Sequence, residues 1–188
     1  RSTLFPYTTL FRSNQLAVTV YGAFAQGVGK GGSAFGFLSR AGQWGSAFGL
    51  EAQAVGVAAT ALGFGSNATG LNSVAIGGAG GDGTTPLSVA NSTTASGAGS
   101  IAMGSNATRG AQAAAADSIA LGGQSSVAAA ATSGIAVGRG ATVSGAYGIA
   151  AGDSAAANGQ AIALGNGAKA NGSQSISIGT GNVVSGNN

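Results

Sequence analysis

The chain of 188 residues contains no cysteine and no histidine. Disulfides are thereby excluded, together with the thiolate and imidazole ligands of common zinc sites and the most frequent general base of enzymes. Charged residues make up only 6% of the sequence, against roughly a quarter in an average soluble domain. Without Arg1 and Arg12, five widely spaced basic residues face four acidic ones. Such a balance contains no basic patch, so nucleic-acid binding is not indicated.

The first thirteen residues lack the pattern of the rest of the chain. Thr3–Ser13 reads TLFPYTTLFRS, which resembles the translation of a common short-read sequencing adapter, and it includes one of the two prolines. We therefore expect residues 1–13 to be a non-native segment and the domain to begin at residue 14. The last ten residues, 179–188, look like a repeat interrupted midway, so we expect a fragment of a longer protein.

Glycine is abundant, with 37 residues, and it recurs at regular intervals. The unit is a small or apolar residue, alanine, a large apolar residue and glycine, as in Val74-Ala75-Ile76-Gly77 and Ile119-Ala120-Leu121-Gly122. The terminal glycines of the units lie at positions 22, 36, 49, 63, 77, 104, 122, 138, 152, 165 and 179. Seven of their ten spacings are 13 or 14 residues. A fixed period of this kind indicates a repeat architecture.

Each repeat is too short for a pair of helices and alternates with a period of two, which is typical of a short strand bounded by glycine. A second, more polar strand follows in each repeat, for example around Asn67-Ala68 or Lys169-Ala170. Two strands and two turns in roughly 14 residues predict an all-β fold, a flattened parallel β-roll solenoid from about Val18 to Val184. Eleven coils stacked 4.8 Å apart would form a rod about 50 Å long.

The alternation gives the first strand of each repeat two different faces. We expect the large residues to fill the interior of the roll, and alanine to form a stripe on the opposite face that serves as a subunit interface, because a strand apolar on both faces is usually buried on both. The expected interior residues are Val74, Ile76, Ile101, Met103, Ile119, Leu121, Ile135, Val137, Ile162, Leu164, Ile176 and Ile178. The expected interface stripe is alanine at positions 34, 47, 61, 75, 102, 120, 136, 150 and 163.

The spacing of 27 residues between Gly77 and Gly104 exceeds one repeat by 13. We expect an inserted loop over about 78–98, since the interval contains Pro86, which cannot donate to a sheet ladder, and several turn-forming residues. Insertions into solenoids often lie on the face that binds partners. A neutral insertion and a binding loop remain equally open.

The repeats resemble the head repeats of YadA-like trimeric autotransporter adhesins, on the motifs Asn72–Gly77, Asp117–Gly122 and Gly159–Gly165. The resemblance covers nearly all of residues 14–188. It implies a left-handed β-roll, a homotrimer, display on the outer membrane of a Gram-negative bacterium, and adhesion to host matrix, cells or other bacteria. A phage tail-fibre segment or another trimeric surface spike is the alternative. The sequence does not identify the ligand.

No pattern in the chain indicates catalysis, a cofactor or a metal. Gly27–Gly32 fits G-x-G-x-x-G, but a glycine-rich chain produces that pattern by chance and no strand–helix context follows. Gly77–Asp82 matches the start of a calcium-binding nonapeptide only once, whereas such sites need stacked copies. Acyltransferase solenoids have a hexapeptide period and a histidine base. The acidic residues lie on separate repeats, at Glu51, Asp82, Asp117 and Asp153. We therefore expect no enzyme activity and no catalytic, cofactor or metal site.

Overall fold

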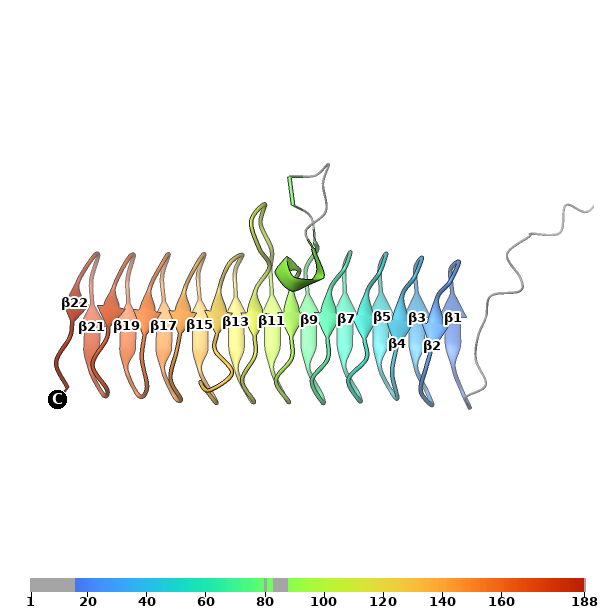
Figure 1. The fold of residues 1–188 in the computed structure, drawn as a ribbon, viewed down its shortest axis with the longest axis horizontal. Coiled ribbons are helices and arrows are strands. Elements are labelled where there is room, and N and C mark those ends of the chain that lie inside the picture. The colour runs from blue at the N-terminus through green and yellow to red at the C-terminus, as the bar shows by residue number, and fades with distance from the viewer. Residues whose placement is uncertain (1–15, 80, 83–87, 188) are drawn as a thin grey trace, which may run out of the picture.

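The computed structural model describes residues 16–79, 81–82 and 88–187. The chain forms a rod-shaped β-solenoid in which eleven coils, here called rungs, stack along one axis (Figure 1). Each rung contributes one strand to each of two parallel sheets of eleven strands. The predicted all-β solenoid is therefore confirmed. The expected adapter-like segment 1–13 and Pro86 lie outside the described residues.

The first sheet, called here the odd-strand sheet, consists of three-residue strands that contain the large apolar residues of the repeat. Consecutive rungs pair in register, so that Val74 pairs with Ile101 and Ile101 with Ile119. Its strands are β1 (Thr19–Tyr21), β3 (Ser33–Phe35), β5 (Ser46–Phe48), β7 (Thr60–Leu62), β9 (Val74–Ile76), β11 (Ile101–Met103), β13 (Ile119–Leu121), β15 (Ile135–Val137), β17 (Ile149–Ala151), β19 (Ile162–Leu164) and β21 (Ile176–Ile178).

The second sheet, the even-strand sheet, consists of two-residue strands. Its strands are β2 (Gln26–Gly27), β4 (Arg40–Ala41), β6 (Gln53–Ala54), β8 (Asn67–Ala68), β10 (Thr94–Ala95), β12 (Gln112–Ala113), β14 (Ser126–Val127), β16 (Thr142–Val143), β18 (Ala156–Ala157), β20 (Lys169–Ala170) and β22 (Val183–Val184). In the described part of the chain the only helix is one 3₁₀ turn, η1 (Val89–Asn91).

The interior between the two sheets is filled by small residues. The central residue of every odd strand from β3 to β21 is buried, and so is the second residue of every even strand from β2 to β20. Sixteen of these twenty residues are alanine. Buried serines beside the strands direct their hydroxyls to backbone carbonyls three residues earlier, as Ser73 Oγ does to Gly70 O at 2.8 Å. The core is therefore a thin slab of methyl groups and satisfied hydroxyls.

The two faces of the odd strands were assigned to the wrong sides by the sequence prediction. The predicted interface stripe, including Ala75, Ala120 and Ala136, is 0% exposed and lies in the interior. None of the twelve large residues predicted to be interior is buried: for example, Met103 is 41% exposed and Ile178 is 63% exposed. The reason is the size of the rung. Strands of three and two residues face each other across methyl groups, and close packing leaves no volume for isoleucine or leucine.

Side-chain volume is balanced across the interior where the alanine pattern is broken. In the first rung Gly27 replaces the alanine of the even strand, and a Cβ on Gly27 would lie 2.0 Å from Val18 Cγ1. In the middle of the rod Val127 and Val143 replace that alanine, and the facing residue Gly134 has no room for a Cβ, which would lie 2.9 and 3.0 Å from their Cγ1 atoms. An increase in volume on one sheet is thus matched by a decrease opposite.

Glycine follows each odd strand because the rungs meet there backbone to backbone. Gly49 has a φ of 135°, which side chains disfavour, and a Cβ on it would lie 2.6 Å from the carbonyl oxygen of Gly63 in the next rung. The repeated glycine of the sequence pattern is therefore required twice, for its backbone angle and for the close approach of successive rungs.

The regular rungs are interrupted near the middle of the rod. The insertion, defined here as residues 78–91, follows β9 and ends in η1 (Figure 1). It is shorter than the predicted 78–98, because Thr94–Ala95 form β10 in register with β8. The next rung is four residues longer than usual and contains a small hairpin over 105–110, closed by an antiparallel bridge between Ser105 and Gly110.

Candidate functional site

The outer surface of the odd-strand sheet is apolar along most of the rod. Its outward residues are the first and third of each strand, and those from β9 to β21 are valine, isoleucine, leucine, methionine or, once, alanine. Most are half-buried in the single chain, and some are exposed, including Leu62 at 47% and Met103 at 41%. Scattered exposed apolar residues are ordinary, but a continuous exposed apolar face marks an interaction surface.

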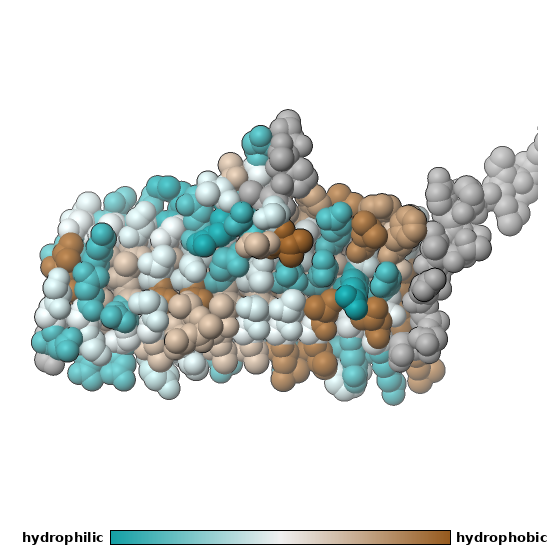
Figure 2. Space-filling view, in the orientation of Figure 1, coloured by the Kyte–Doolittle hydropathy of each residue, from teal (hydrophilic) through white to brown (hydrophobic). Residues whose placement is uncertain are grey.

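The same face changes in character toward the N-terminus. In β1, β3, β5 and β7 the first outward residue is serine or threonine, and in the first three of these strands the third is aromatic. Phe35 and Phe48 stack with ring centroids 4.8 Å apart, and in the neighbouring turns Phe24 meets Phe37 edge to face at 5.7 Å. Hydrophobic side chains gather over the N-terminal rungs in Figure 2, to the right. In these N-terminal strands a larger third residue accompanies a smaller first residue on the same outer face.

The outer surface of the even-strand sheet is polar. Each even strand has one outward residue, and nine of the eleven are polar or charged. They are Gln26, Arg40, Gln53, Asn67, Thr94, Gln112, Ser126, Thr142 and Lys169, with Ala156 and Val183 as the exceptions. The two sheets therefore present surfaces of opposite polarity, one suited to burial against protein and one suited to water or a polar ligand.

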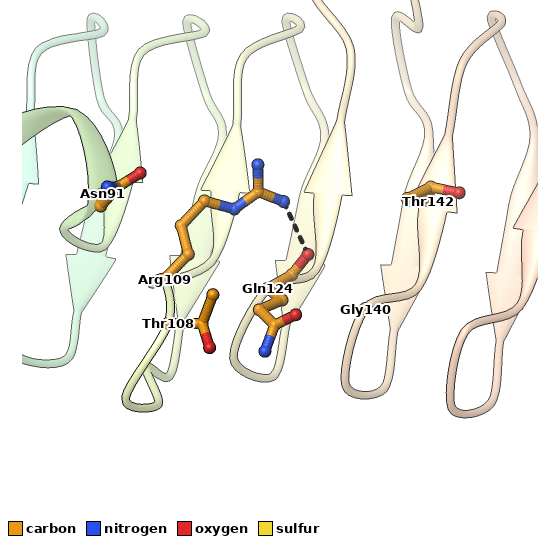
Figure 3. Close-up of a pocket in the computed structure, with 6 residues that line it drawn as sticks. All are labelled: Asn91, Thr108, Arg109, Gln124, Gly140 and Thr142. Atoms are coloured by element: carbon orange, nitrogen blue, oxygen red, sulfur yellow. Dashed lines mark hydrogen bonds between the residues drawn. The ribbon is translucent and has the colours of Figure 1, made fainter. Parts of the chain in front are cut away.

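A polar pocket of about 430 Å³ lies beside the two interruptions of the solenoid. It is lined by Asn91, Thr108, Arg109, Gln124, Gly140 and Thr142, which come from η1, the hairpin, two successive turns and β16 (Figure 3). The hairpin is held against η1 by the hydrogen bond from Gly110 N to Asn91 O, at 2.7 Å. The pocket lies where the hairpin and η1 interrupt the otherwise regular rungs.

Arg109 is the charged residue of this pocket. Its Nη2 donates to the backbone carbonyl of Gln124 at 2.8 Å, and its own carbonyl accepts from Gln124 N at 3.0 Å. The hairpin that carries it is fixed by Asn106, whose Oδ1 accepts from the backbone N–H groups of Thr108 and Arg109 at 2.9 and 3.1 Å. The hydrogen bond to Gln124 therefore positions the guanidinium beside the pocket (Figure 3).

The acidic residues do not assemble into a catalytic or metal-binding group in the described part of the chain. No cluster of three or more histidine, cysteine, aspartate or glutamate residues occurs there. Asp153 pairs with Arg139 of the neighbouring turn, and hydrogen bonds from Arg139 and then from Ser154 lower the pKa of its carboxyl. Within the same residues, no helix is both long enough and apolar enough to cross a bilayer.

Sequence reasoning missed the pocket, although the sequence contained a signal for it. The spacing of 18 residues between Gly104 and Gly122 exceeds the usual repeat by four, and these extra residues form the hairpin that carries Arg109. The predicted loop over 78–98 borders the pocket only through Asn91 at the end of η1. What could not be read from spacing is that the two interruptions, in successive rungs, meet in space.

Comparisons with known proteins agree with this geometry. The YadA head domain repeat family matches residues 45–66, 54–79, 91–107 and 156–188. The crystal structure of the collagen-binding domain of the Yersinia adhesin YadA is similar, with a TM-score of 0.55 and 30% sequence identity over 86% of this chain and 69% of that chain. No curated protein matches the sequence. The repeats, the parallel solenoid and this identity show that the chain belongs to the family of YadA-like adhesin heads.

Proposed function

We propose that the chain is the head of a trimeric autotransporter adhesin, displayed on the outer membrane of a Gram-negative bacterium, which attaches to host matrix, to host cells or to other bacteria. We also propose that the roll is left-handed, which the resemblance to this family implies. The matching Yersinia domain is described as collagen-binding, which makes fibrous matrix protein the first ligand class to test. Because the family is that of an adhesin head, we favour this function over a phage tail fibre.

The apolar outer face of the odd-strand sheet is the observation that supports a homotrimer. It runs along most of the rod, which by the usual spacing of strands is about 50 Å long, and its exposure would be costly in a stable monomer. Three identical chains around an axis parallel to the rod would each bury this face, and closed symmetry would leave none of it exposed. The polar even-strand sheet would then form the outside of the trimer, where a ligand can reach it.

Two matched pairs of lysine substitutions test the trimer. The Ile135→Lys/Ile162→Lys variant places charge on the odd-strand face of β15 and β19, and the Ser126→Lys/Ala156→Lys variant places the same charge on the even-strand face of β14 and β18. We expect analytical ultracentrifugation to give three chains for the unaltered protein and for the second variant, and dissociated chains for the first, because unpaired like charges would be buried around the axis. A trimer that tolerates the first variant would refute this interface.

Adhesion is tested with the same proteins. The trimer and the dissociated variant are passed over immobilised fibrillar collagen, with fibronectin, laminin and bacterial cells as further surfaces. Trimeric presentation strengthens a weak contact by avidity. We therefore expect the trimer and the even-strand variant to be retained at least about tenfold more strongly than the dissociated chain. Failure of the trimer to bind any of these surfaces would contradict the proposed adhesion.

We further propose that the insertion over 78–91 is presented three times by the trimer and adds to the contact with the ligand. Long loops cost little stability, so an insertion can be kept or lost without harm to the fold. The test variant replaces residues 79–90 with a short Gly-Ser turn. It keeps Asn91, the last residue of η1, and the register of β10. Reduced adhesion with an intact trimer supports the proposal, and unchanged adhesion would assign binding to the regular even-strand surface instead.

A further inference from the structure

We infer that the polar pocket beside Arg109 is a binding site for an acidic saccharide, a sugar unit that carries a carboxylate. The pocket lies in a single chain, between η1, the hairpin over 105–110 and the turns of the next rungs. It is separate from the apolar odd-strand face proposed for assembly. The inference deepens the proposed adhesion by naming a ligand class, but the binding itself does not require a trimer.

The size and the lining of the pocket suit a small hydrophilic ligand. About 430 Å³ falls within the range of small-molecule sites. The side chains of Asn91, Thr108, Gln124 and Thr142 offer amide and hydroxyl groups, and Gly140 contributes no side chain. Hydroxyls and amides can both donate and accept, which matches the hydroxyls of a sugar. The pocket is lined by no aromatic or large aliphatic side chain.

The position of Arg109 selects a negative charge on that sugar. A guanidinium has five N–H donors in a planar fork, which matches a carboxylate. One of its nitrogens is held by the carbonyl of Gln124 at 2.8 Å, and this fixes the fork without neutralising it. Among the described residues, Arg139 forms an ion pair with Asp153. Arg109 forms no ion pair with any described residue. Arg109 is half-buried, is oriented by Gln124, forms no ion pair with the described residues and lies beside hydroxyl and amide groups, which together suit a carboxylated sugar.

The neighbouring arginine provides a matched control. Arg139 lies in the turn after β15, next to Gly140 of the pocket, yet it is exposed, is paired with Asp153 and does not line the pocket. The substitutions Arg109→Gln and Arg139→Gln remove the same charge from the same edge of the solenoid. Only the first removes it from the pocket. A general electrostatic attraction would respond to both, and a defined site would respond to one.

Binding is measured by calorimetry and by saturation-transfer NMR on the intact protein, with three probes: 3′-sialyllactose, an unsulfated uronate-containing disaccharide, and neutral lactose. We expect the two carboxylated sugars to bind and lactose not to. Arg109→Gln should weaken binding by about tenfold or more, since hydrogen bonds to charged groups are the stronger kind, and Arg139→Gln should leave it unchanged. Thr142→Val, which keeps the shape and removes a hydroxyl, should give a smaller loss.

Several outcomes would overturn the inference. They are equal binding of lactose, no binding of any carboxylated sugar at millimolar concentration, or equal losses for the two arginine variants. Repeating the titration on the dissociated Ile135→Lys/Ile162→Lys variant separates this site from the proposed function: sugar binding should persist in single chains that no longer adhere to matrix. If the trimer adheres but the pocket is empty of sugar under every condition, only the saccharide site fails.

Discussion

The two sheets of the roll share one interior and differ in what they present outside. Toward each other both sheets present alanine, as Ala136 of β15 and Ala170 of β20 illustrate. Away from each other, the odd-strand sheet presents rows of isoleucine and leucine, whereas the even-strand sheet presents glutamine, threonine, lysine and arginine. The residues that pack the interior of the rung are therefore different from those that the same short strands present outside.

This separation explains how a repeat can vary without loss of the fold. A residue on an outer face pairs with its counterparts in the rungs above and below, so one row can change from phenylalanine through leucine to isoleucine along the rod. A residue in the interior faces the opposite sheet, and there the chain keeps small residues or exchanges volume across the slab, as Gly27 and Val18 do. Close-packed interiors tolerate substitution best when total volume is kept.

The largest expected effect comes from breaking the shared interior. Ala136→Lys would place a charged side chain where the wild-type residue is 0% exposed and where no partner could neutralise it. We expect loss of the folded state, seen as loss of the cooperative thermal transition in circular dichroism. The control is Val137→Lys, one residue along β15 on the outer face, which should stay folded. A folded, dissociated Ala136→Lys chain would instead indicate that Ala136 lies at a subunit contact.

The sequence was sufficient to predict the repeat, the strands, their parallel stacking and the existence of two distinct apolar faces. It was misread on which face points inward, because burial in a core and burial in a subunit contact leave the same apolar signature. The deciding quantity was the width of the rung. The inward residues of the even strands are also mostly alanine, for example Ala68 and Ala170. The two sheets therefore pack too closely for large inward side chains on the odd strands.

The candidate pocket was less accessible to sequence reasoning than the fold. Irregular spacing revealed that residues were added, at 78–91 and at 105–110, but not that η1 and the hairpin would touch through Gly110 and Asn91. The pairing of Arg109 with a backbone carbonyl also has no pattern in sequence, since every residue offers a carbonyl. Repeats predict what recurs, whereas a site built from departures requires the three-dimensional structure.

A smaller effect is expected from disturbing the balance of volume between the sheets. Gly27→Ala would bring a Cβ within 2.0 Å of Val18 Cγ1, and overpacking of this kind costs about 1–3 kcal/mol. Val18→Ala alone should cost about 1 kcal/mol through lost packing. The double variant should lose less unfolding free energy than the two single variants lose together, because the shorter side chain at position 18 removes the clash. Denaturant unfolding measures the cycle, and strict additivity would show that the two positions do not compensate.

The smallest effect concerns the turns that join the two sheets, where Arg139 and Asp153 pair on the surface. The hydrogen bond from Arg139, followed by that from Ser154, lowers the pKa of the Asp153 carboxyl in the folded chain. A group whose folded pKa is depressed stabilises the fold above its unfolded pKa of about 4, and this contribution disappears as pH falls through the folded pKa. Exposed pairs contribute little and are screened by salt.

We therefore expect the thermal midpoints of wild type and Asp153→Asn to differ slightly at pH 6 and low salt, and to converge below pH 3. A difference that persists in acid would show that Asp153 stabilises the fold through its shape or its hydrogen bonds to the turn. The charge of its carboxylate would then contribute nothing measurable to the stability of the roll.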